Sequence, residues 1–184
     1  MPGNFLGSTL VLLKDGDPPP ASLSLAAGIS LIRAVEAVAP ATGLMLKWPN
    51  DLLMGSGKLA GILLERSDNR LVAGFGVNLA QAPELDERST ATLSSVALIS
   101  PQSFAPVLAG AFARALDMWR TDSKRLTTSW MESAHPVGSA IRVHDCGGDD
   151  LAGTFAGLDA DGALRLACKD GSERVIRAGD VALD

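Results

Sequence analysis

The residues of this chain that could do chemistry together are two lysines, an aspartate, and several glycines and asparagines in its first half. Lysine ammonium groups can neutralise negative charge that develops where anionic groups react. Glycines let a ligand approach the backbone closely. These residues fall in three short motifs: Lys47-Trp48-Pro49-Asn50-Asp51, Lys58-Leu59-Ala60-Gly61-Ile62-Leu63-Leu64-Glu65 and Gly74-Phe75-Gly76-Val77-Asn78.

Apolar runs between Gly, Asn and Asp predict buried strands that carry these motifs on their ends and turns. We expect residues 52–54 and 58–65 to form an antiparallel hairpin around Gly55-Ser56-Gly57. A turn at Asp68-Asn69 should lead into a strand over residues 71–78. Strand ends are places where a rigid sheet can present functional groups to a ligand.

The flanking segments predict helices that pack on this sheet. We expect a helix over residues 23–38, capped by Ser22, because apolar residues recur there at helical spacing. A second helix should cover residues 104–119, and residues 126–133 should extend the helical layer. Further expected elements are strands over 4–13 and 44–47, and a long loop over 80–103 with a short helix near 93–98.

The pattern changes at His135-Pro136, where helical periodicity gives way to short strands. The expected strands cover residues 140–143, 150–158, 163–167 and 173–177, and the turns are Gly147-Gly148, Asp161-Gly162 and Asp170-Gly171. This pattern predicts a small, five-stranded, barrel-like module. We therefore divide the chain into domains over residues 1–134 and 135–184.

The composition excludes several classes of protein. With 184 residues, a net charge of −5 and a pI near 5.0, the chain lacks the basic surface that binds nucleic acid. Cys146 and Cys168 have no metal-ligand spacing, so we expect reduced thiols and a cytoplasmic location. The N-terminus has no charged region of a signal peptide, and no apolar run suggests a membrane protein.

The three motifs, in this order and at these spacings, resemble the catalytic core of bacterial biotin–protein ligases. Residues 157–164 and 178–181 are similar to the C-terminal domain of the same family. The resemblance implies an α/β fold of the α+β type, with a mixed, largely antiparallel sheet packed with helices and followed by an SH3-like β-barrel. It also implies a biotin–[acetyl-CoA-carboxylase] ligase that uses ATP and Mg²⁺ to form biotinyl-AMP.

The expected second step passes biotin to a lysine of a biotin carboxyl carrier domain, and the resemblance leaves a homodimer open. It implies that Lys58 contacts the biotin carboxylate and the reacting phosphate. Lys47 and Asn50 would lie near the triphosphate and its metal. Asn4 would belong to the ATP site, and Asn78 would bind adenine. Without the resemblance, Lys58 is more simply a solvated residue at a hairpin end.

The remaining motif residues have a functional and a structural interpretation each. Asp51 could orient Lys58 or the incoming lysine amine, or could be a turn residue. Gly61 and Ile62 could offer backbone groups to the biotin ureido ring, while Gly74 and Gly76 allow close approach to ring systems. The structural interpretation of Gly61 is a glycine tolerated in a buried strand, or a bulge. We expect Trp48 and Trp130 to be packing residues, and we find no cluster of metal-ligating side chains.

The chain also departs from the family pattern. The family has a Gly-Arg-rich loop, and a Ser-Thr-Asn segment of the biotin pocket, upstream of the part that matches Gly3-Asn4. Neither is present here, and neither is the DNA-binding helix-turn-helix of repressor-type members. Either the true protein is longer, or the chain is a truncated, non-catalytic biotin- or partner-binding fragment. A lipoyl ligase is disfavoured by the Lys47 motif and by the C-terminal module.

Overall fold

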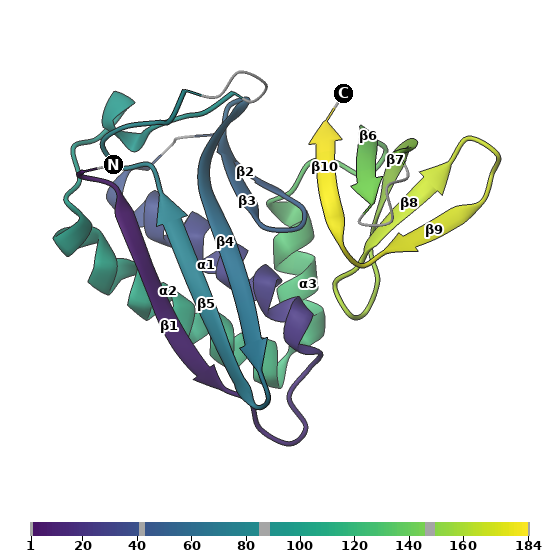
Figure 1. Ribbon diagram of the computed structural model, residues 1–184, viewed down its shortest axis with the longest axis horizontal. Helices are drawn as coiled ribbons and strands as arrows, with labels where there is room; N and C mark the ends of the chain where they lie inside the picture. Colours follow the sequence, from purple (N-terminus) through teal and green to yellow (C-terminus); the bar gives the residue numbers. More distant parts are fainter. Residues whose placement is uncertain (1, 41–42, 85–88, 146–149, 184) are drawn as a thin grey trace.

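A computed structural model describes residues 2–40, 43–84, 89–145 and 150–183, which form two five-stranded antiparallel sheets and three α-helices (Figure 1). This confirms the predicted fold class. The spatial order of the first sheet is β1-β5-β4-β3-β2. Its strands are β1 (Phe5–Leu12), β2 (Leu44–Lys47), β3 (Asp51–Met54), β4 (Gly57–Ser67) and β5 (Arg70–Val77).

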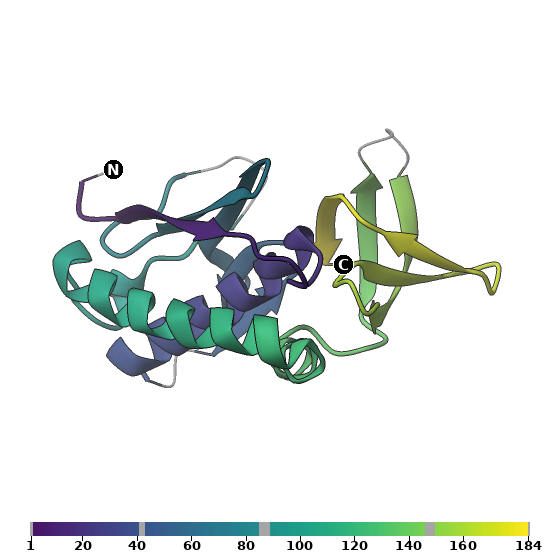
Figure 2. The ribbon, with the colours of Figure 1, turned by 90° about the horizontal axis from the view of Figure 1, so that it is seen from below.

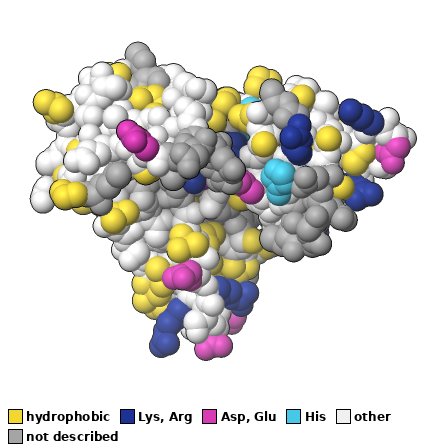
Figure 3. Space-filling model, turned by 45° about the horizontal axis from the view of Figure 1, so that its top comes forward, with side chains coloured by type: hydrophobic (Ala, Val, Ile, Leu, Met, Phe, Trp, Pro, Cys, Tyr) yellow, Lys and Arg dark blue, Asp and Glu magenta, His cyan; other side chains and the backbone are white. Residues whose placement is uncertain are grey.

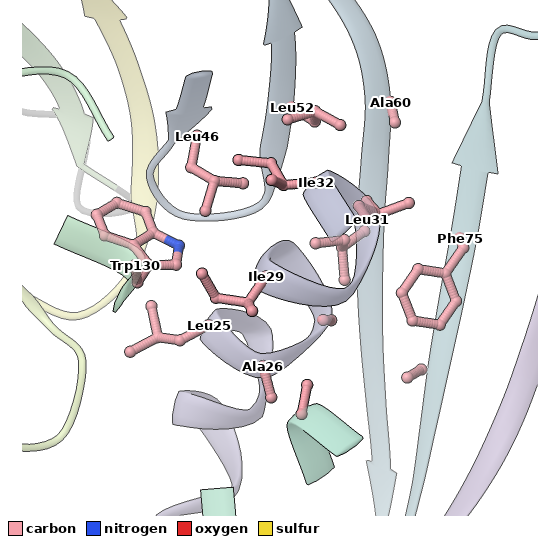
Figure 4. Packing of buried hydrophobic residues seen from close by; sticks show 14 of the residues in the cluster. Leu25, Ala26, Ile29, Leu31, Ile32, Leu46, Leu52, Ala60, Phe75 and Trp130 are labelled. Atoms are coloured by element: carbon pink, nitrogen blue, oxygen red, sulfur yellow. The ribbon is translucent and has the colours of Figure 1, made fainter. Parts of the chain in front are cut away.

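The helices cover one face of the first sheet and leave its other face open (Figure 2). They are α1 (Leu23–Val38), α2 (Pro101–Thr121) and α3 (Ser123–Glu132). The predicted bounds of α1 are confirmed. The segment Pro20–Val38 is long and apolar enough to cross a membrane by composition, but 67% of its 18-residue apolar window is buried inside the protein. It is the core helix, packed between the sheet, α2 and Trp130 of α3 (Figure 4).

The predicted cap of α1 is wrong. No side-chain hydrogen bond caps α1 at Ser22. Its hydroxyl instead donates to the Pro19 carbonyl at 2.7 Å and accepts from Trp119 Nε1 at 2.8 Å. The contact with a buried indole from α2 takes the oxygen that a cap would have used. Packing between two helices therefore overrides the local preference of serine for a helix N-terminus.

The long loop before α2 is shorter than predicted. Its helical part is one 3-10 turn, Leu93–Ser95, and not a helix reaching residue 98. The helix α2 begins at Pro101 and not at Phe104, because Ser100 caps it by accepting a hydrogen bond from the Ser103 N–H at 3.1 Å. Proline at the first helical position supports this start.

The second sheet has the order β10-β6-β7-β8-β9 and confirms the predicted β module. Its strands are β6 (Ala140–Asp145), β7 (Asp150–Leu158), β8 (Leu164–Cys168), β9 (Glu173–Ile176) and β10 (Gly179–Leu183). Gly162 and Gly171 both have φ +82°, as their turns require. Cys146 and the turn predicted at Gly147-Gly148 lie outside the described residues. The boundary between residues 134 and 135 stays a prediction.

Candidate active site

A floor of glycine backbone lies on the open face of the first sheet. Gly61 of β4 is the direct cross-strand neighbour of Gly76 on β5, and Gly74 is paired with Leu63. Gly61 and Gly76 line a hollow of about 240 Å³, together with Asn4, Leu6, Lys58, Leu59, Ala60, Val77, Asn78, Pro83 and Thr90. Residues of the second and third motifs thus meet around this hollow, and the first motif is joined to them through the ion pair of Asp51 with Lys58.

A β-bulge aims Lys58 into this hollow. The register between β3 and β4 shifts between Leu52 and Leu53, which pair with Ala60 and Lys58. Residues three apart on a regular strand point to opposite faces, but the extra residue at this bulge brings Lys58 and Gly61 to the same face. A Cβ on Gly61 would lie 3.2 Å from Lys58 Cε and 3.3 Å from its Nζ. The ammonium group therefore lies directly over Gly61.

Asp51 is a buried carboxylate held between two ammonium groups. Its side chain is 4% exposed, and it stands opposite Gly61 in the β3–β4 pair. Lys58 Nζ lies 2.5 Å from Oδ1, although the angles are outside those of a regular hydrogen bond, and Lys47 Nζ lies 3.6 Å from Oδ2. Two cations offset the large free-energy cost of burying one carboxylate. Asp51 can therefore fix the position of Lys58.

Lys47 connects this site to the second sheet. Its ammonium donates to the Val181 carbonyl of β10 at 2.6 Å and lies 3.5 Å from Asp180 Oδ1. Lys47, Asp51, Lys58, Asp180 and Val181 line a second hollow of about 340 Å³ between the two sheets. Acidic and basic side chains lie along the line where the two parts of the molecule meet (Figure 3). No local sequence pattern predicted that Asp180 or Val181 would lie beside Lys47. Val181 is 134 residues away from Lys47 along the chain.

The asparagines predicted to bind ATP form hydrogen bonds with backbone groups in this structure. Asn50 Nδ2 donates to the Ile62 carbonyl at 2.8 Å, and the Ile62 N–H donates to the Asn50 carbonyl at 2.9 Å. Both backbone groups of Ile62 are thus engaged, and its side chain is in the core. Asn4 Oδ1 accepts from the N–H groups of Ala80 and Gln81, each at 3.0 Å. The Asn4 contacts hold the residues after β5 at the edge of the hollow.

Asn78 ties the start of β4 to the loop before α2. Its Nδ2 donates to the carbonyls of Lys58 at 3.3 Å and Ala91 at 3.1 Å, while its Oδ1 accepts from Asn4 Nδ2 at 3.4 Å.

Trp48, which the sequence predicts to be a packing residue, is buried and donates from Nε1 to the Gly162 carbonyl at 3.0 Å. Trp130 is also buried. Both packing predictions are confirmed.

Comparison with known proteins identifies relatives of the whole chain. A family model described as the biotin protein ligase C terminal domain matches residues 137–184. The biotin–[acetyl-CoA-carboxylase] ligase of Paracoccus denitrificans is 35% identical, over 97% of this chain and 80% of its own length. The enzyme of the same name from Mycobacterium tuberculosis is 37% identical over 86% of this chain, which spans 61% of that relative.

Solved structures show the same fold. The apo biotin protein ligase of Aquifex aeolicus superposes with a TM-score of 0.85 at 20% identity, over 99% of this chain and 83% of that one. The same enzyme in complex with biotin and ATP has a TM-score of 0.82 at 22% identity, over 99% and 78% of the two chains. The architecture seen here is therefore shared with a protein whose structure contains both ligands.

Proposed function

The chain belongs to the biotin–[acetyl-CoA-carboxylase] ligase family, and from that membership we propose that it activates biotin with ATP and transfers it to a lysine of a carboxylase carrier domain. The observation that carries this proposal is the position of Lys58. Its ammonium group lies over Gly61, the cross-strand neighbour of Gly76, and the buried carboxylate of Asp51 holds it there.

In the first step, an oxygen of the biotin carboxylate attacks the α-phosphorus of ATP and pyrophosphate leaves. Both reactants are anions, so the transition state gains from a positive charge fixed in advance between them. Lys58 suits this role because it is 34% exposed and lines both hollows of the site. A ligand can therefore reach its ammonium group, although its carboxylate partner is buried.

The glycine floor supports a place for biotin beside this lysine. Gly61, Gly74 and Gly76 remove side chains from neighbouring positions of β4 and β5, so a flat ring could lie against the backbone. Asn4 and Asn78, at the edge of the same hollow, would frame the adenosine. In the second step the carrier lysine amine attacks the acyl carbon and AMP leaves, and Asp51 would orient that amine.

Magnesium belongs to the same proposal. Mg²⁺ with nucleotides is usually held by phosphate oxygens and one or two carboxylates, and it offsets phosphate charge. Within the part of the chain that the structure describes, no group of three His, Cys, Asp or Glu side chains could hold a metal alone. An ion held mainly by phosphate oxygens does not require such a group. A cytoplasmic location also belongs to the proposal, since the Cys168 thiol is free.

Biotin-dependent exchange of labelled pyrophosphate into ATP tests the first step, and transfer of biotin to a purified carrier domain tests the second. We expect Lys58→Ala to lower the exchange kcat by about a hundred- to thousand-fold, the usual effect of removing one preorganised donor. Lys124→Ala, an exposed lysine on α3, is the matched control and should leave exchange unchanged. The assignment of Lys58 fails if Lys58→Ala keeps normal turnover and only raises the KM for ATP.

A further inference from the structure

The second lysine of the site differs from Lys58 in its surroundings. An ammonium group has three N–H donors. Around Lys47 Nζ there are three oxygen atoms: the Val181 carbonyl at 2.6 Å, Asp180 Oδ1 at 3.5 Å and Asp51 Oδ2 at 3.6 Å. Its side chain is only 13% exposed. Three protein oxygens therefore surround the Lys47 ammonium group, one as a hydrogen-bond acceptor and two as ion-pair partners.

A phosphate would meet an unfavourable field at this lysine. Two carboxylates, Asp51 and Asp180, lie within 3.6 Å of the Lys47 ammonium. A phosphate oxygen that replaced either of them, or the Val181 carbonyl, would still lie close to like charge. Lys58 has Asp51 as its carboxylate neighbour and an exposed side on the hollows.

We infer that Lys47 is a positioning residue that ties strand β10 to Asp51, and through Asp51 fixes Lys58, and that it is not a phosphate ligand. The two oxygens of Asp51 are divided between the two lysines, with Oδ1 beside Lys58 and Oδ2 beside Lys47. Removing Lys47 leaves Asp51 free to turn and lets Lys58 leave its place over Gly61. This inference rests on the proposed function and deepens it, because it makes β10 part of the reaction centre.

Whether the loss of Lys47 changes kcat or the KM for ATP tests this inference in the full chain. For Lys47→Met in pyrophosphate exchange, we expect kcat to fall about tenfold while the KM for ATP stays within about twofold. Loss of a ground-state phosphate contact would do the opposite and raise KM. A tenfold rise in the KM for ATP with an unchanged kcat would overturn the inference.

Asp180→Asn supplies a variant that touches no proposed substrate and keeps the size of the side chain. It should lower kcat in the same direction as Lys47→Met and by less, and it should add nothing in the double variant because both changes break one connection. Asp161→Asn is the matched control, since Asp161 lies in the same module beside Arg177 and not beside Lys47. Additive effects of Asp180→Asn and Lys47→Met would count against the connection.

Two measurements decide the inference without any catalytic activity. In NMR spectra of ¹⁵N-lysine-labelled chain, Lys47→Met should shift the Lys58 ammonium signal, which is assigned by its loss in Lys58→Met. In a denaturant double-mutant cycle, the stability effects of Lys47→Met and Asp180→Asn should be non-additive. An unmoved Lys58 signal together with additive stabilities would overturn the inference. If the wild-type chain shows no exchange, the proposed function fails, and these two measurements still decide the role of Lys47.

Discussion

At the scale of single residues, the position of Lys58 depends on a missing side chain. Gly61 leaves open the space into which the lysine stem folds, and the bulge in β4 brings the two residues to one face of the sheet. Asp51 then holds the ammonium group at 2.5 Å. Gly61, the bulge in β4 and the Asp51 carboxylate together thus set the position of the Lys58 ammonium group.

Gly61→Ala should displace this charge without unfolding the protein. The new Cβ would lie 3.2 Å from Lys58 Cε and 3.3 Å from Nζ, closer than an ordinary contact. Because the end of a lysine is flexible, it can move away, so we expect about a tenfold loss of exchange kcat and a change in unfolding free energy below about 1 kcal/mol. Exchange kinetics and urea unfolding would measure both.

Gly110→Ala on α2 is the control for this change. It adds the same methyl group where the nearest heavy atom is Arg114 Nη1 at 3.6 Å. Replacing a helical glycine by alanine should raise the unfolding free energy by up to about 1 kcal/mol and leave kcat unchanged. A normal kcat for Gly61→Ala would show that Lys58 does not need its place over Gly61.

At the scale of elements, the turn between β2 and β3 joins the two parts of the molecule. The last residue of β2 and two residues of the turn bind different elements, and β2 also forms a bridge to the residues after α3 through Leu46 and Ala134. Their hydrogen bonds run from Lys47 to the Val181 carbonyl, from Trp48 to the Gly162 carbonyl and from Asn50 to the Ile62 carbonyl. The segment that carries Asp51 is thereby fixed from three sides.

Trp48→Phe should loosen the contact between the two sheets. It removes the Nε1 donor and leaves the Gly162 carbonyl without that bond in a buried position, which costs about 1–3 kcal/mol of unfolding free energy. We also expect faster proteolysis of the connection at residues 136–139. Trp119→Phe is the control, because it loses an indole bond to Ser22 inside the first part of the molecule. Equal cleavage rates in both variants would contradict this role of Trp48.

At the scale of the whole molecule, a buried histidine lies where the two sheets meet. His135 is 2% exposed, its ring centroid lies 4.3 Å from that of Phe155, and neither of its nitrogens has a hydrogen-bond partner of regular geometry among the described residues. Burial lowers the pKa of His135, and the positive charge of Lys47 acts in the same direction. The nearby Leu46 backbone favours the charged form, but burial outweighs it.

Stability should therefore fall in mild acid. The unfolded histidine titrates near pH 6.5, whereas the folded one stays neutral to lower pH, so the unfolded state binds more protons below about pH 6.5. The stabilising contribution of His135 is present above that pH and is lost as the pH falls toward the lowered pKa. Urea unfolding between pH 7.5 and 5 should show a smaller decline for His135→Phe than for the wild type. The control is His144→Gln, which changes an exposed histidine on β6. Parallel curves for His135→Phe and the wild type would rule out this contribution.

The sequence by itself determined the elements and their order. The apolar period of residues 23–38 and the glycine and aspartate turns act through neighbours in the chain, so α1, the β3–β4 hairpin and the strands of the second sheet follow from local patterns. The same motifs point to the ligase family, which the relative from Paracoccus denitrificans confirms. Which residues bind biotin or ATP stays a prediction at every named position.

Only the tertiary structure decided where the charges of the site lie. A strand of regular period would put Lys58 and Gly61 on opposite faces, and the bulge that joins them exists only when β4 pairs with β3. The Ser22 hydroxyl turns from a cap to a helix contact only when Trp119 packs against it. Lys47 meets Val181 across 134 residues of chain. Such contacts depend on how separate elements dock, and docking is set by the shape of the assembled core, which no local pattern contains.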